Sequence, residues 1–180
     1  MSKKFEKEFI SYCENQNLEV NPNQIKVIKK LEVYYQSNYK SFFSKLFSKQ
    51  KTKKGFYLYG GVGVGKTMIL NFFYDHLDKK KLKQHFNEFM LGFHDFVHER
   101  KEKNEENVIN QFVKNLKSKA SLIYFDEFQV TNIVDAMILG KLFEQIFRED
   151  IKIILTSNTK ISELYKDGPV SYTHLRAHET

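Results

Sequence analysis

The stretch Phe56–Leu70, FYLYGGVGVGKTMIL, constrains the fold of this chain most strongly, because it places four glycines within six residues, between an aromatic run and an apolar one. Gly60, Gly65, Lys66 and Thr67 match the pattern G-x-x-x-x-G-K-[ST]. Such a loop joins a strand to a helix, and its bare backbone lets successive N–H groups and the positive helix end approach an anion. The spacing therefore predicts a phosphate-binding loop.

The roles of individual loop residues follow from the chemistry of a bound triphosphate. We expect Lys66 to reach the β and γ phosphates, and the Thr67 hydroxyl to bind Mg²⁺. The Gly61 and Gly63 spacing also suggests a dinucleotide fingerprint, but Lys-Thr directly after Gly65 is typical of phosphate loops and disfavours NAD. The residues predicted to contact the nucleotide are Gly60, Gly61, Val62, Gly63, Val64, Gly65, Lys66, Thr67 and Met68.

From Gly55 onwards the chain alternates between apolar strands and helical segments. We expect strands at 55–59, 82–86, 121–128 and 151–158, and helices at 66–77, 88–101, 107–117 and 133–147. Strands with near-continuous apolar runs are covered on both faces, so this order predicts an α/β fold with a parallel sheet sandwiched by helices. Helical spacing over residues 23–47 predicts one or two further helices before the lysine-rich loop 48–54.

Polar side chains stand at the carboxyl ends of two predicted strands, where open parallel sheets bind ligands. Asp126 and Glu127 follow the apolar run Leu122–Phe125. We expect Asp126 to hold Mg²⁺ through water, and Glu127 to deprotonate the water that attacks the γ phosphate. Asn158 would hydrogen-bond that water and a γ-phosphate oxygen. The alternative for Asp126 and Glu127 is a carboxylate pair on the surface, and the alternative for Asn158 is a helix or turn cap. The first strand and Leu122–Phe125 have room to be neighbours in the sheet.

Composition and charge bound the class of protein. The chain has 180 residues, 41% of them apolar and 15% aromatic, which is enough for the core of one domain. Residues 1–54 hold 12 Lys against 5 Glu, so the net charge of +7 is N-terminal. No ordered aromatic pattern accompanies these lysines, and we do not expect a nucleic-acid partner. Without a signal-like or membrane-spanning apolar run we expect a cytoplasmic protein, with Cys13 a bystander.

Four longer strings carry a family resemblance over about Gly55–Gly168: GFYLYGGVGVGKTMILNFFYD, HFNEFMLGFH, FDEFQVTNIVDAMILGKLFEQIF and ILTSNTKISELYKDG. They resemble the ZapE cell-division ATPases of bacteria, which are related to the mitochondrial lactation-elevated ATPases. The resemblance implies an AAA+ type core, Mg-dependent ATP hydrolysis and association with the division ring protein FtsZ at the division site. Mitochondrial relatives serve inner-membrane protein quality control. By this resemblance Gly60–Thr67 is Walker A, Asp126 and Glu127 are Walker B, and Asn158 is sensor one.

The resemblance divides the chain into a basic helical segment (1–54), an ATPase core (55–168) and a tail (169–180). The tail, PVSYTHLRAHET, resembles no part of the family and reads as translated adapter sequence, so we give it no function. Relatives continue past LYKDG to a last core strand, an arginine finger and a helical lid. Without that strand GFYLY would be an uncovered sheet edge. We therefore expect this chain by itself to bind ATP weakly and hydrolyse it slowly.

Two other functions fit the same residues: a phosphate-loop kinase acting on a metabolite, and a nucleotide-dependent adaptor that binds without turnover. Glu127 directly after Asp126, and the TSN string, favour hydrolysis over transfer. His94 and His98 resemble a zinc motif at helical spacing, but no third ligand is evident and we do not expect zinc. The expected metal ligands are Thr67 and Asp126, and the expected partners are ATP, a protein and further copies of the chain.

Overall fold

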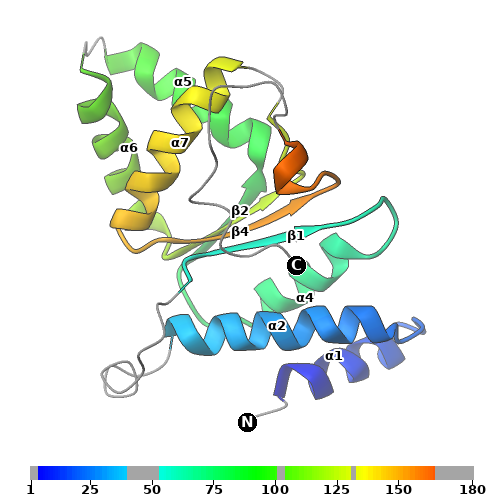
Figure 1. Ribbon diagram of the computed structural model, residues 1–180. Helices are drawn as coiled ribbons and strands as arrows, with labels where there is room; N and C mark the ends of the chain where they lie inside the picture. The colour runs from blue at the N-terminus through cyan, green and yellow to red at the C-terminus, as the bar shows by residue number, and fades with distance from the viewer. Residues whose placement is uncertain (1–3, 40–52, 101–103, 131–132, 165–180) are drawn as a thin grey trace. The chain divides into compact units, whose positions relative to one another are not determined.

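The computed structural model describes residues 4–39, 53–100, 104–130 and 133–164 (Figure 1). These residues form two compact units, a helical unit within 4–53 and 63–77 and a sheet unit within 54–62 and 78–164. The phosphate-loop stretch therefore passes from the sheet unit into the helical unit between Val62 and Gly63. No helix in the described ranges is both long and apolar enough to cross a membrane.

The sheet unit is built on four parallel strands in the order β1-β4-β3-β2 (Figure 1). Their bounds are Gly55–Tyr59 for β1, Lys81–His85 for β2, Leu122–Asp126 for β3 and Lys152–Ser157 for β4. All four predicted strands are confirmed, with ends shifted by a few residues. One expectation is wrong: β1 and β3 are not neighbours, because β4 pairs with both of them. In the described part of the chain β1 is an edge strand, as expected.

Strands β1, β3 and β4 are buried on both faces of the sheet, which is why they read as near-continuous apolar runs, whereas β2 is mostly polar and only partly buried. On one face the strand side chains join a core with helices α5 (Phe86–Arg100), α6 (Glu105–Lys119) and α7 (Ile133–Arg148). On the other face the alternate strand side chains are buried as well. The first set includes Tyr57, Ile123, Phe125, Ile153 and Leu155, and the second includes Phe56, Leu58, Leu122, Tyr124 and Ile154.

Helix α7 shows how the pattern becomes packing. Ala136, Leu139, Leu142, Phe143 and Ile146 recur every three or four residues and are all buried. These five positions of α7 therefore belong to the core, whereas Val134 and Met137 on the same helix are exposed.

The helical unit consists of α1 (Lys4–Asn15), α2 (Pro22–Tyr39) and α4 (Lys66–Asp75). Aromatic rings pack α1 onto α4: the ring of Phe9 lies edge-on to Phe72 at 5.0 Å between centroids, and Phe5 lies 5.4 Å from Phe73. These four side chains are buried. The sequence pattern places helices only from residue 23 onwards, so α1 is an addition of the structure, and it buries Cys13.

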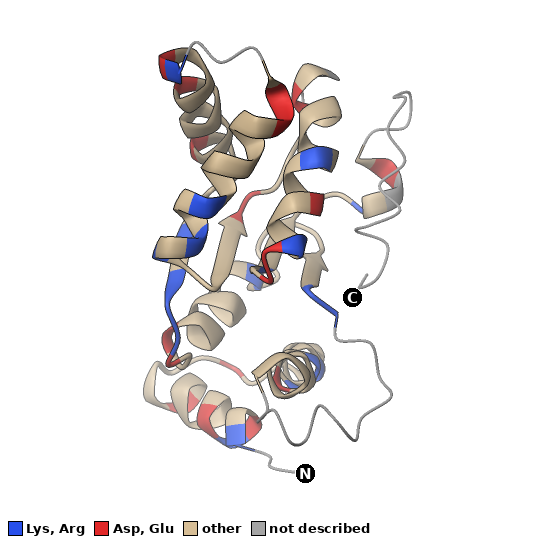
Figure 2. Cartoon of the chain, turned by 90° about the vertical axis from the view of Figure 1, so that its left-hand side faces the viewer, with Lys and Arg blue, Asp and Glu red and all other residues tan. Residues whose placement is uncertain are grey.

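Several sequence predictions fall partly or wholly outside the described residues: the helical pattern beyond residue 39, the loop 48–54 up to residue 52, the last residue of the helix 88–101, parts of the ATPase core 55–168, and the tail 169–180. The basic excess of 1–54 is only partly described, because five of its twelve lysines lie within 1–3 and 40–52. On the helical unit lysines stand among acidic residues (Figure 2), and Lys29 pairs with Glu6 at 3.0 Å.

Candidate functional site

The carboxyl ends of three strands bring six of the predicted site residues to one edge of the sheet unit. Tyr59 on β1 is in register with Ser157 on β4, and the N–H of Gly60 donates to the carbonyl of Ser157 at 3.2 Å. Asn158 follows directly and is exposed. Parallel pairing forces these ends onto the same edge, since the chain runs in one direction in every strand. The six residues are Gly60, Gly61, Val62, Asp126, Glu127 and Asn158.

Asp126, the last residue of β3, is the buried member of this group, with 6% of its surface exposed. Its Oδ1 accepts a hydrogen bond from the hydroxyl of Thr156 on β4 and a second from the N–H of Glu127 at 3.1 Å. A buried carboxylate needs such donors, because desolvation of an unpaired charge is costly. The contact with Thr156 holds the carboxylate at the sheet edge.

Glu127 leaves the strand in an unusual backbone conformation. Its φ is +55°, in the left-handed region that side chains other than glycine enter infrequently. Its N–H is shared between Asp126 Oδ1 and Thr156 Oγ1, each at 3.1 Å, and these contacts hold the turn. The Glu127 side chain points to solvent, 76% exposed, and its Oε2 lies 3.9 Å from Nδ1 of His85 at the end of β2. A strained backbone at a strand end is typical of functional sites.

The remaining loop residues belong to the helical unit. Gly63 and Gly65 have φ values of +80° and +83°, so these two glycines occupy the conformation that requires them. Gly65 is the residue before α4, which begins at Lys66. Gly63, Val64 and Thr67 are exposed, while Lys66 and Met68 are partly buried. The predicted loop-to-helix junction is therefore present, with an accessible backbone at the helix N-terminus.

Three neighbours of the predicted site residues were not predicted from the sequence. Thr156 stands two residues before Asn158 in the TSN string, and only the pairing of β3 with β4 shows that it contacts Asp126. His85 ends β2, in register with Asp126. Gln24 in α2 donates its Nε2–H to the carbonyl of Val64 at 3.2 Å. A strand-end histidine was a visible signal, whereas Gln24 carried none.

One histidine of the zinc-like motif, His94, is hydrogen-bonded to a carboxylate of another helix. Nε2 of His94 lies 2.8 Å from Oδ1 of Asp135, which links α5 to α7. Within the described ranges no group of three histidine, cysteine, aspartate or glutamate side chains is placed to hold a metal ion.

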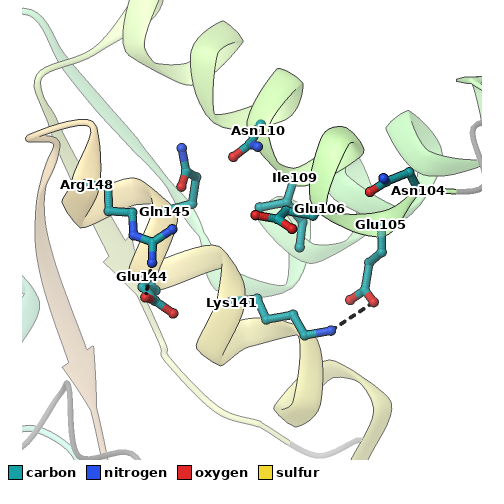
Figure 3. A pocket seen from close by; sticks show the side chains of 9 residues that line it. All are labelled: Asn104, Glu105, Glu106, Ile109, Asn110, Lys141, Glu144, Gln145 and Arg148. Atoms are coloured by element: carbon teal, nitrogen blue, oxygen red, sulfur yellow. Dashed lines mark hydrogen bonds and ion pairs between the residues drawn. The ribbon is translucent and has the colours of Figure 1, made fainter.

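A cavity of about 730 Å³ opens between α6 and α7 (Figure 3). Four of its charged side chains form two ion pairs, with Lys141 at 2.9 Å from Glu105 across the helices and Arg148 at 2.6 Å from Glu144 along α7. None of the predicted site residues lines this cavity. It is therefore a separate feature of the sheet unit.

Curated relatives share the sequence over most of this chain. Lactation elevated protein 1 homolog B of Danio rerio is 39% identical over 131 residues, covering 67% of this chain and 26% of the relative. The cell division protein ZapE of Escherichia coli K12 is 32% identical over 163 residues, covering 81% of this chain and 43% of ZapE. The chain thus spans from about a quarter to less than half of the length of these relatives.

Solved structures share the fold at low sequence identity. AMPPCP-bound DnaA from Aquifex aeolicus matches with a TM-score of 0.61 and 17% identity, over 89% of this chain and 46% of DnaA. DnaI matches with a TM-score of 0.58 and 17% identity, over 89% of this chain and 81% of DnaI. These likenesses confirm the predicted α/β fold with a parallel sheet sandwiched by helices.

The family model of the AFG1-like ATPases matches residues 11–180 of this sequence. The match covers both units. The relatives of this chain include the ZapE and lactation-elevated proteins that the four longer strings resemble. The chain therefore belongs to the AFG1-like ATPase family.

Proposed function

We propose that the chain binds ATP at Gly60–Thr67 and hydrolyses it to ADP and phosphate in a Mg²⁺-dependent reaction. The observation that carries the proposal is the shared edge of β1, β4 and β3, which gathers Gly60, Asn158, Asp126 and Glu127. A phosphate-loop start, an amide and two carboxylates at the carboxyl ends of adjacent parallel strands are the groups that phosphoryl transfer to water requires.

The loop would bind the phosphates mainly through its backbone. The positive φ of Gly63 and Gly65 and the start of α4 at Lys66 supply N–H groups and a helix N-terminus, both of which attract anions. Lys66 would add a point charge on the β and γ phosphates. The similar fold of DnaA, solved with AMPPCP, supports a nucleotide as the ligand.

The donor set suits Mg²⁺, which prefers hard oxygen ligands. Asp126 offers a buried carboxylate whose orientation is fixed by Thr156, and the motif assigns the Thr67 hydroxyl as the second ligand. When bound, the ion would neutralise charge that develops on the transferred phosphate.

The reaction itself would depend on Glu127 and Asn158. Glu127 would accept a proton from the attacking water while the water oxygen forms a bond to the γ phosphorus. The bond between that phosphorus and the ADP oxygen would break at the same time. The exposed Asn158 amide would orient the water and bond a γ-phosphate oxygen. The exposed Glu127 carboxylate is accessible to the water it must activate.

The cellular role extends from the relatives. ZapE is named a cell division protein, which supports a role in cell division. As part of the proposal, the chain would act on the FtsZ ring as a cytoplasmic enzyme and would assemble with further copies of itself. A kinase or an adaptor without turnover would use the same loop.

Phosphate release from ATP without any acceptor tests the proposal. We expect Mg²⁺-dependent release by the full chain, abolished by EDTA. Release only after a metabolite acceptor is added would indicate a kinase, and tight nucleotide binding without release would indicate an adaptor.

A further inference from the structure

Gln24 joins the first turn of α2 to the phosphate loop. Its Nε2 donates to the carbonyl oxygen of Val64 at 3.2 Å, across forty residues of sequence and within the helical unit. Its Oε1 is buried and has no hydrogen-bond partner among the described residues. Among the described residues, the side-chain amide of Gln24 therefore makes its hydrogen bond through the N–H group, and this bond goes to the phosphate loop.

We propose that Gln24 is a positioning residue that aims the Gly65 N–H of the phosphate loop; this inference rests on the proposed ATP site. A trans peptide is planar, and its C=O and N–H point in opposite directions. The peptide between Val64 and Gly65 is trans. Holding its carbonyl toward α2 therefore directs its N–H away from α2, to the opposite side of the loop. A loop that binds an anion through its backbone N–H groups binds it more tightly when these groups already point toward the anion site.

The shape of Gly65 agrees with this role. A Cβ built on Gly65 would lie 2.7 Å from Nε2 of Gln24, closer than side-chain atoms pack. Its φ of +83° already favours glycine. The Gln24 amide thus lies directly on the bare backbone of the loop, where a side chain on residue 65 would displace it.

The sharpest change is Gln24→Leu, which keeps the approximate shape of the side chain and removes the donor. We expect ATP to bind roughly 2- to 10-fold more weakly, the range that loss of one neutral hydrogen bond gives. Gln24→Glu should weaken binding further, because a carboxylate would repel both the Val64 carbonyl and the phosphates. Gln36→Leu is the matched control: Gln36 lies on the same helix, and its amide bonds Glu32 at 3.3 Å and not the loop.

Inorganic tripolyphosphate separates positioning of the loop from other roles. The full chain and each variant are titrated with a fluorescent ATP analogue and Mg²⁺, which is then displaced by ATP or by tripolyphosphate. Because the proposal concerns a phosphate-binding N–H, Gln24→Leu should weaken both ligands by the same factor. Thermal unfolding without ligand should show Gln24→Leu no less stable than Gln36→Leu.

The outcomes are distinct. Unchanged binding by Gln24→Leu, a loss for ATP without a loss for tripolyphosphate, or an equal loss in Gln36→Leu would each overturn the role of Gln24. Lys66→Ala serves as the reference for the site itself. If Lys66→Ala binds both ligands as the unaltered chain does, the proposed ATP site fails, and the result does not bear on Gln24 alone.

Discussion

The hydroxyl of Thr156 on β4 donates to the carboxylate of Asp126 at the end of β3, thirty residues earlier in the chain. Thr156 also accepts from the N–H of Glu127 at 3.1 Å, so one buried side chain contacts both members of the predicted carboxylate pair. The pairing of β3 with β4 creates this contact. Thr156 therefore fixes where the two carboxylates leave the sheet.

Thr156→Val should disturb the site while keeping the volume of the side chain. The variant leaves a buried carboxylate with one donor fewer, and such a loss costs about 1–3 kcal/mol. We expect a lower melting temperature and slower phosphate release. Thr156→Ser retains the hydroxyl and is the matched control. Equal phosphate release by Thr156→Val and Thr156→Ser would show that the hydroxyl does not support the carboxylates.

Glu127→Gln should separate binding from turnover. The amide keeps the size of the side chain but cannot accept the proton of the attacking water, so turnover should fall roughly 10²- to 10⁴-fold. ATP affinity should remain, because Glu127 is not predicted to hold the phosphates. Single-turnover phosphate release and an equilibrium titration measure the two quantities. Turnover at the unaltered rate would remove Glu127 from the proposed chemistry.

Local patterns predicted much of the fold. The glycine-rich loop, the three apolar strands β1, β3 and β4, the short strand β2 and the helices from residue 66 onwards all had signals within a few neighbouring residues. The order of the strands had no such signal, because placing β4 between β1 and β3 depends on pairing across long connections. Helix α1 was not predicted, although it had a local signal: Phe5, Phe9 and Cys13 lie four residues apart, which is helical spacing, and all three are buried.

The sequence predicted the candidate-site residues that belong to a short motif. It did not predict the residues that are identified only by their contacts in the folded chain. Lys66, Thr67 and Asp126 follow from short strings. Thr156 and Gln24 act through hydrogen bonds to residues thirty and forty positions away, which no local spacing encodes. Supporting residues of this kind depend on tertiary packing alone.

Asp150 gives a prediction about pH. Burial would raise the pKa of Asp150, but Lys152 at 2.6 Å and Lys54 at 3.3 Å outweigh it and lower the pKa below its ordinary value of 3.8. Because the pKa of Asp150 is lower in the folded chain than in the unfolded chain, the ionised carboxylate stabilises the fold at pH values above 3.8. This stabilisation is lost as the pH falls through the pKa of the folded chain. Asp150→Asn should therefore unfold at lower urea concentration at pH 7.

The difference between Asp150→Asn and the unaltered chain should shrink as pH falls below 3.8, where the native carboxyl also becomes neutral. Asparagine suits this position, because Asp150 has a φ of +58° that asparagine tolerates. Urea midpoints from pH 7 to pH 3 measure the effect. A midpoint difference that stays constant over this range would contradict the role of the two lysines.

Cys13 tests helix α1 directly. Its side chain is fully buried, and burial, with Glu14 nearby, raises the pKa of its thiol. Since the thiolate is the reactive form, a thiol reagent should modify the native chain very slowly and the chain in urea quickly. The single cysteine makes the reading unambiguous. Rapid modification of the native chain would contradict the packing of α1.

The most direct test of the whole account is the ATP affinity of the full chain compared with that of Lys66→Ala, measured in Mg²⁺ by displacement of a fluorescent nucleotide. We expect saturable binding by the unaltered chain, and a loss of binding in Lys66→Ala, whose missing ammonium group no longer contacts the phosphates. Equal affinity of the two proteins for ATP would contradict it.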